Sequence, residues 1–131
     1  TFLYLQKGTP CIYYGTELAL IGGPDPDCRR VMPWDRVSED NDMLNFMKQL
    51  IQVRKEVASI IQHGSYSLEG VKPDVLSLEW TYQGQLVRAI FNQSQENVVL
   101  DSDSLALSSH CQIEEGQHII LPDGFVVYLS E

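Results

Sequence analysis

The side chains with the most chemical potential gather in one long stretch that has no regular hydrophobic pattern. Residues 17–36 include two adjacent glycines, and their second half crowds charges around an indole: Arg29, Arg30, Trp34, Asp35 and Arg36. Paired charges and an indole in such a segment can be fixed against a neighbouring surface. Loops longer than about 12 to 15 residues are uncommon in compact domains and are usually functional or disordered. The specific polar and aromatic content favours a functional loop.

Other common chemistries lack the residues that they require. No two histidines have the helical spacing of metal sites, and the odd number of cysteines contains no CxxC, which argues against a structural zinc site or a disulfide framework. These residues are His63, His110, His118, Cys11, Cys28 and Cys111. The adjacent glycines precede a proline instead of a helix, so they do not form a phosphate-binding loop. We therefore expect no metal, no cofactor, and reduced thiols in a cytoplasmic protein.

Composition narrows the partners further. The 131 residues carry 9 basic and 18 acidic side chains, a net charge of -9, and 44% of the residues are hydrophobic. A negative protein repels phosphate backbones, so we expect no nucleic acid partner. No apolar run approaches the roughly 18 residues of a membrane-spanning helix, so we expect no membrane insertion. The hydrophobic content is sufficient for a packed core.

A helix joins two regions of the chain, and the first region contains the long loop and the segment that precedes it. Thr9 to Tyr14 is a short apolar, aromatic and β-branched run between Gly8 and Gly15, which is typical of a strand buried on both faces. Such a strand needs neighbours, which this chain does not supply. Phe2 to Leu5 looks like the end of an apolar helix, and the chain begins with Thr1 instead of methionine. We therefore expect a fragment of a longer protein.

Apolar residues at helical spacing predict an amphipathic helix after the loop. They are Met43, Phe46, Met47, Leu50, Ile51 and Val57. Asn41 or Asp42 can cap the start of this helix, and Arg54 and Lys55 lie near the negative end of its dipole. A stripe of this width favours core packing over a partner-binding face.

From residue 65 onward the hydrophobic period changes from helical to strand-like. Strands are predicted at residues 65–69, 75–82, 85–92, 97–100, 118–121 and 125–129. Hairpin turns are predicted at residues 82–85 and 122–124, and an acidic surface loop at residues 101–104. Six short strands with close turns imply an antiparallel β-sandwich. The predicted fold class is therefore mainly β.

Three segments and a small β domain follow one another in a characteristic order. The segments are GTPCIYYGTE at residues 8–17, GGPDPDCRRVMPWD at 22–35 and QLIQVRKE at 49–56. In this order they resemble the C-terminal end of the alpha-amylase family of glycoside hydrolases, and the loop is most similar to the cyclomaltodextrinase, neopullulanase and maltogenic amylase branch. Many relatives have aspartate at the position of Thr16. The resemblance implies that residues 1–60 are the C-terminal remnant of a catalytic TIM barrel, with its last strand, a long active-site loop and its last helix. It also implies that residues 61–131 are a C-terminal β-sandwich domain.

The resemblance places the catalytic residues outside this chain. Active sites of TIM barrels lie at the carboxyl ends of the strands, which puts the long loop on the chemical face. Retaining glycosidases use two carboxyl groups about 5 to 5.5 Å apart, and in this family they lie on earlier strands, in motifs that this sequence lacks. Glu17 and Asp35 have no second carboxylate placed beside them. We therefore expect no catalytic residue in the chain.

Sugar binding is what the resemblance assigns to the loop. The positions that match the family's glucose contacts are Asp25 and Arg29, and a carboxylate with a guanidinium suits vicinal hydroxyls. Alternatively, these residues pair with each other, or with Asp27 and Arg30, to hold the loop. Trp34 can stack on a sugar ring, but a packing anchor is the favoured interpretation.

The preferred function is the C-terminal part of an enzyme that hydrolyses α-1,4-glucosidic bonds in cyclomaltodextrins, pullulan or maltodextrins. Its partners are an α-glucan oligosaccharide or cyclodextrin and the upstream barrel domain of the same protein, and the chain alone is expected to be inactive. The alternative is a stand-alone carbohydrate-binding or interaction module. In that alternative Trp80 and Tyr82, which share one face of a strand, form a sugar-stacking platform. The two residues can equally line the sandwich core, which is the favoured interpretation.

Overall fold

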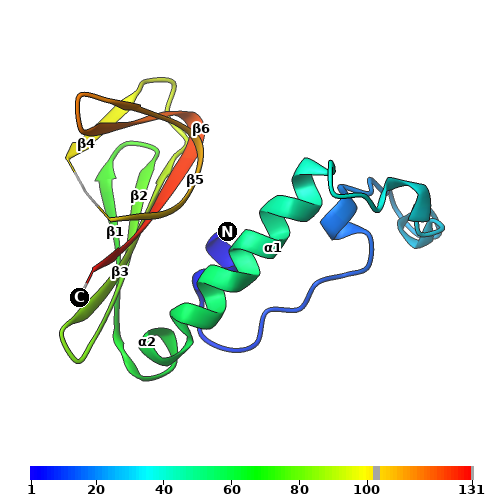
Figure 1. The fold of residues 1–131 in the computed structure, drawn as a ribbon, viewed down its shortest axis with the longest axis horizontal. Helices are drawn as coiled ribbons and strands as arrows, with labels where there is room; N and C mark the ends of the chain where they lie inside the picture. Colours follow the sequence, from blue (N-terminus) through cyan, green and yellow to red (C-terminus); the bar gives the residue numbers. More distant parts are fainter. Residues whose placement is uncertain (102–103, 131) are drawn as a thin grey trace. The chain divides into compact units, whose positions relative to one another are not determined.

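The computed structural model describes residues 1–101 and 104–130, so Ser102 and Asp103 of the expected acidic loop lie outside the described residues. The chain divides into two compact units, Thr1–Arg54 and Lys55–Glu131, which we call the N-terminal unit and the β unit. Figure 1 shows the elements of each. The boundary between the units falls in the last turn of a helix. A domain division between residues 60 and 61 stays a prediction.

The N-terminal unit is irregular chain with short 3₁₀ turns, followed by one long helix. Its elements are η1 (Phe2–Leu5), η2 (Thr16–Leu18), η3 (Asp27–Arg29), η4 (Trp34–Arg36) and most of α1 (Asp42–Glu56). The strand predicted at Thr9–Tyr14 is wrong, because this segment has no regular secondary structure. A barrel strand makes its backbone hydrogen bonds only to neighbouring strands, and the described part of this unit contains no strand that could pair with this segment. The assignment of residues 1–60 to the remnant of a catalytic barrel therefore stays a prediction.

Helix α1 confirms the predicted amphipathic helix. Asn41 is its cap, because the Asn41 Oδ1 accepts a hydrogen bond from the Leu44 amide at 2.9 Å. Met47, Leu50 and Val53 are its buried residues, one every three positions. This spacing is that of a stripe that packs into a core.

The β unit is an antiparallel sheet preceded by a short helix (Figure 1). Its elements are α2 (Ala58–His63), β1 (Ser65–Lys72), β2 (Val75–Tyr82), β3 (Gln85–Asn92), β4 (Val98–Asp101), β5 (Leu105–Glu114) and β6 (Gln117–Ser130). The strand order is β1-β2-β3-β6-β4, and β5 also pairs with β6. The long β6 pairs with β4 along its first half and with β3 along its second half. The mainly β class is confirmed, whereas a division into two stacked sheets stays a prediction.

The hairpin turn predicted at residues 122–124 is wrong. These residues lie inside β6, where Asp123 has a φ of 59°. A single residue with positive φ can bend or bulge a strand without reversing the chain. The strands predicted at 118–121 and 125–129 are therefore two halves of one strand.

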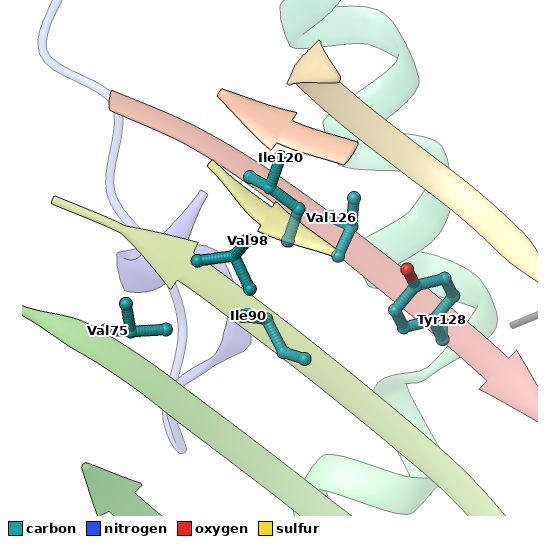
Figure 2. Close-up of a cluster of buried hydrophobic side chains, with 6 residues drawn as sticks. All are labelled: Val75, Ile90, Val98, Ile120, Val126 and Tyr128. Carbon is teal, nitrogen blue, oxygen red and sulfur yellow. The ribbon is translucent and has the colours of Figure 1, made fainter. Parts of the chain in front are cut away.

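The core of the β unit draws side chains from strands that are distant in sequence. Figure 2 shows the cluster, which comes from β2, β3, β4 and β6 and consists of Val75, Ile90, Val98, Ile120, Val126 and Tyr128. Burying each such side chain stabilises the fold by about 1.5–3 kcal/mol. Side chains alternate along a strand, so Trp80 faces the opposite side of β2 from Val75. The sheet is thus buried on both faces at its centre.

Tyr128 forms the polar end of this cluster. Its hydroxyl lies 3.0 Å from Nδ1 of the buried His118, and the two rings stack with centroids 5.5 Å apart. Burial, with a smaller contribution from Cys111, raises the pKa of Tyr128 to about 12, while Arg88 opposes the shift. The folded β unit therefore favours the neutral phenol.

Ionisation of Tyr128 is expected to destabilise the β unit at alkaline pH. The pKa of Tyr128 is about 12 in the folded state and about 10 in an unfolded chain. Its stabilisation is therefore complete below about pH 10 and is lost, up to about 2–3 kcal/mol, as the pH rises through 12. Urea unfolding at a series of pH values measures this loss. Tyr128→Phe removes the titrating group, and Tyr66→Phe, at an exposed tyrosine, is the matched control. Equal alkaline losses in the native chain and Tyr128→Phe would contradict the prediction.

Candidate functional site

Asp25 and Arg29 lie together on the outside of the loop. Arg29 Nε is 3.0 Å from Asp25 Oδ1, and the two side chains are 70% and 63% exposed, respectively. The structure thus brings together the two residues that the sequence singles out for sugar binding. It also places them as the alternative expects, paired with each other. A guanidinium has five N–H donors and a carboxylate has two acceptor oxygens, so the pair retains further capacity for a ligand.

Asp27 and Arg30 brace the same turn. Arg30 Nε donates to Asp27 Oδ1 at 2.7 Å, and Arg30 Nη2 donates to Asp27 Oδ2 at 2.8 Å. The hydrogen bonds from Arg30 lower the pKa of Asp27 below its ordinary value. The chain passes close to this carboxylate at Gly23, where an added Cβ would lie 2.9 Å from Asp27 Oδ2. The braced turn holds the backbone that presents Asp25 and Arg29.

Tyr14 ties the loop to the segment that precedes it. The Tyr14 hydroxyl donates to the Arg30 carbonyl at 2.8 Å, across 16 residues of sequence. Its ring also lies near that of Tyr13, with centroids 4.7 Å apart. Sequence reasoning missed this anchor, and its one signal is the pair of adjacent tyrosines. Tyr14 and the Asp27–Arg30 pair thus fix the loop at the same point.

Trp34 does not serve as a packing anchor in the described structure. It begins η4, and its side chain is 72% exposed. The favoured sequence interpretation is therefore wrong for this residue. The indole remains accessible to a ligand or partner.

Glu17 and Asp35 lie in different surroundings. Glu17 lines a mainly apolar pocket of about 370 Å³ between residues 12–14 and α1, and Lys48 is the other charged residue in its lining. Its Oε2 is buried without a hydrogen-bond partner. Asp35 is exposed in η4. No second carboxylate is in the lining of the pocket that contains Glu17, so this pocket does not resemble the paired carboxyl groups of a retaining glycosidase.

The sheet does not offer the stacking platform of the alternative function. Trp80 is 2% exposed, and its ring contacts that of Tyr66 with centroids 4.6 Å apart. A sugar cannot reach an indole buried to this extent. A platform formed by Trp80 and Tyr82 is therefore wrong, and the core interpretation of Trp80 is confirmed.

The described ranges hold neither a cluster of metal-ligating side chains nor a membrane-spanning helix. Within residues 1–101 and 104–130, no three His, Cys, Asp or Glu side chains gather in a way that could hold a metal ion. Over the same ranges, no helix has the length and apolar character needed to cross a membrane. The three cysteines, Cys11, Cys28 and Cys111, are free thiols.

Comparison with known proteins places these features in a family. No family model matches the chain. It is 41% identical over 100 residues to the intracellular maltogenic amylase of Bacillus subtilis, covering 75% of this chain and 17% of that protein. It is 32% identical over 99 residues to the cyclomaltodextrinase of Thermoanaerobacter pseudethanolicus, covering 76% and 17%. The solved maltogenic amylase of S. marinus matches with a TM-score of 0.76 and 26% identity, over 99% of this chain and 18% of that one.

The chain belongs to the alpha-amylase family of glycoside hydrolases. Within that family its relatives are named maltogenic amylase, cyclomaltodextrinase and neopullulanase, and it matches the C-terminal region of these larger enzymes. The chain spans 17% of the length of the first two relatives.

Proposed function

We propose that this chain is the C-terminal part of an enzyme that hydrolyses α-1,4-glucosidic bonds in cyclomaltodextrins, pullulan or maltodextrins. The observation that carries the proposal is the exposed Asp25–Arg29 pair on a braced loop. The names of the relatives support the same substrate class. The ligand is an α-glucan oligosaccharide or a cyclodextrin.

Asp25 and Arg29 contact glucose units of this substrate. The Asp25 carboxylate accepts hydrogen bonds from sugar hydroxyls, and the Arg29 guanidinium donates to them. An exposed ion pair contributes at most about 1 kcal/mol to stability. Sugar hydroxyls can therefore replace the contact between Asp25 and Arg29 at little cost, so the pairing of these residues is compatible with binding.

The catalytic carboxyl groups lie in a part of the enzyme outside this chain. Residues 1–60 are the remnant of the catalytic barrel, and residues 61–131 are its C-terminal β-sandwich domain. The pocket that Glu17 lines has no second carboxylate in its lining, which supports a catalytic pair outside this chain, because hydrolysis with retention needs a second carboxyl group about 5 to 5.5 Å away. The chain alone is therefore inactive, and its protein partner is the upstream barrel.

The enzyme works in the cytoplasm. Two of the three free thiols in this chain, Cys11 and Cys28, are exposed, and exposed thiols persist in a reducing compartment. The relative from Bacillus subtilis is named an intracellular enzyme.

The substrate class can be tested on the protein encoded by the whole reading frame that contains this chain, which we call the whole-frame protein. It is incubated with β-cyclodextrin, pullulan and maltotriose, and with the α-1,6-linked glucan dextran as a control. We expect sugars to be released from the first three substrates and not from dextran. If the whole-frame protein hydrolyses none of the three, the proposed function is contradicted.

A further inference from the structure

Trp34 presents an open indole on a backbone that is held in place. The side chain is 72% exposed. The Trp34 amide donates to the Met32 carbonyl at 3.0 Å, and the Trp34 carbonyl accepts from the Val37 amide at 3.2 Å. Just beyond, Asn41 Nδ2 donates to the Arg36 carbonyl at 3.1 Å. An indole on such a backbone needs little further ordering when a ligand covers it.

Only a short stretch of chain separates Trp34 from the Asp25–Arg29 pair. The chain from Arg29 to Trp34 spans at most about 18 Å even when it is fully extended. Tyr14 limits the movement of this stretch by its hydrogen bond of 2.8 Å to the Arg30 carbonyl. A chain of a few glucose units has a comparable length. One maltooligosaccharide can therefore contact both places.

The surroundings of Trp34 suit a sugar better than an apolar protein surface. Asp35 and Arg36 follow the indole in η4, and both are exposed. A protein partner that buried Trp34 would also remove these charges from water, which costs free energy unless each one is paired. A glucose unit instead presents C–H groups on its face and hydroxyls around its edge. The C–H face can cover the indole while the hydroxyls bind the charged groups.

We propose that Trp34 is a substrate-stacking residue of the loop, whose indole covers the C–H face of one glucose unit while Asp25 and Arg29 bind the hydroxyls of another. This inference rests on the proposed function, since it takes the ligand class from there. It adds an apolar contact to a subsite otherwise made of charges. Carbohydrate sites commonly combine both kinds of contact, because a few polar groups orient a ligand that an apolar wall covers.

The experiment is a fluorescence titration of the 131-residue chain with maltoheptaose. The chain has two tryptophans, and only Trp34 is exposed, because Trp80 is 2% exposed. Sugar binding at the loop should therefore change the emission of Trp34 saturably, with a Kd on the order of 1 mM. Trp34→Ala is read by calorimetry and should weaken binding by about tenfold or more, while Trp34→Tyr should retain part of the affinity.

Val31 supplies the matched control, because it is an aliphatic residue of the same loop and is 87% exposed. Val31→Ala should bind maltoheptaose as the native chain does. Equal affinities of Trp34→Ala and the native chain would overturn the inference, and so would the absence of saturable binding up to about 20 mM. An emission change that depends on protein concentration without sugar would place a second copy on Trp34, which also overturns it.

The failure of this inference can be told apart from a failure of the proposed function. Hydrolysis of β-cyclodextrin by the whole-frame protein, with no effect of Trp34→Ala on maltoheptaose binding, removes the stacking role and leaves the proposed function intact. Loss of binding in Trp34→Ala, in a chain whose whole-frame protein hydrolyses none of the α-glucans, contradicts the proposed function alone.

Discussion

Replacing Asp25 by alanine in the whole-frame protein is expected to lower kcat/KM for β-cyclodextrin by about 10- to 100-fold. The substitution removes the acceptor for sugar hydroxyls and leaves Arg29, now 3.0 Å from the carboxylate, without its partner. A hydrogen bond to a charged group contributes about 1.5–3 kcal/mol, and about 1.4 kcal/mol corresponds to a factor of ten. The contact is made before and during the reaction, so the loss should be mainly in KM. Steady-state kinetics measure it.

Asp40→Ala is the matched control for this substitution. Asp40 is an exposed carboxylate outside the braced loop. Its replacement by alanine therefore removes one negative charge, as Asp25→Ala does, without changing the site. Arg29→Ala should resemble Asp25→Ala, and the double variant should lose less than the sum of the two, because the residues contact each other. If Asp25→Ala has the kinetics of Asp40→Ala, the loop does not bind the substrate through Asp25.

Replacing Asn92 by alanine is expected to lower the free energy of unfolding of the β unit by about 3 kcal/mol. Asn92 is 1% exposed. Its Nδ2 donates to the carbonyls of Glu96, Ile120 and Leu121 at 2.8, 3.0 and 3.1 Å. Its Oδ1 accepts from the amide and hydroxyl of Ser94. Each buried polar group left without a partner costs about 1–3 kcal/mol.

Urea denaturation measures this loss, with the fluorescence of the buried Trp80 reporting on the β unit. Asn97→Ala is the control, because Asn97 is an exposed asparagine a few residues away. It should change the stability by less than about 0.5 kcal/mol. Equal stabilities of Asn92→Ala and Asn97→Ala would show that the β unit does not depend on this hydrogen-bond network.

The elements that local patterns encode could be predicted from the sequence. The stripe around Met47 and Leu50 predicts α1, and the alternation before and after Gly84 predicts the hairpin of β2 and β3. The spacing of Asp25 and Arg29 allows the ion pair that the structure contains. In each case the residues that interact are close in sequence.

Features that depend on distant neighbours could not be predicted in the same way. β5 includes Ser108, Ser109 and Gln112, which obscure a strand-like alternation, and it is a strand because it pairs with β6. Thr9–Tyr14 has the composition of a buried strand but lies in irregular chain, because a strand also requires partners. Composition alone does not supply them.

Some features of the candidate site could be predicted from the sequence, and others depend on the fold. Asp25 and Arg29 could be selected because their segment carries the family resemblance. The anchor from Tyr14 to the Arg30 carbonyl joins residues 16 positions apart, so only the folded chain reveals it. The exposure of Trp34 is likewise a property of the fold, and it reverses the interpretation that residue type favours.

The most direct test of the proposed function is a parallel assay of β-cyclodextrin hydrolysis by the whole-frame protein and by the 131-residue chain at equal molar concentration. We expect ring opening and release of maltose or glucose by the whole-frame protein, and no product above the buffer blank from the chain. Hydrolysis by the chain would place a catalytic pair within these residues and contradict the proposed function. So would a whole-frame protein that leaves the cyclodextrin intact.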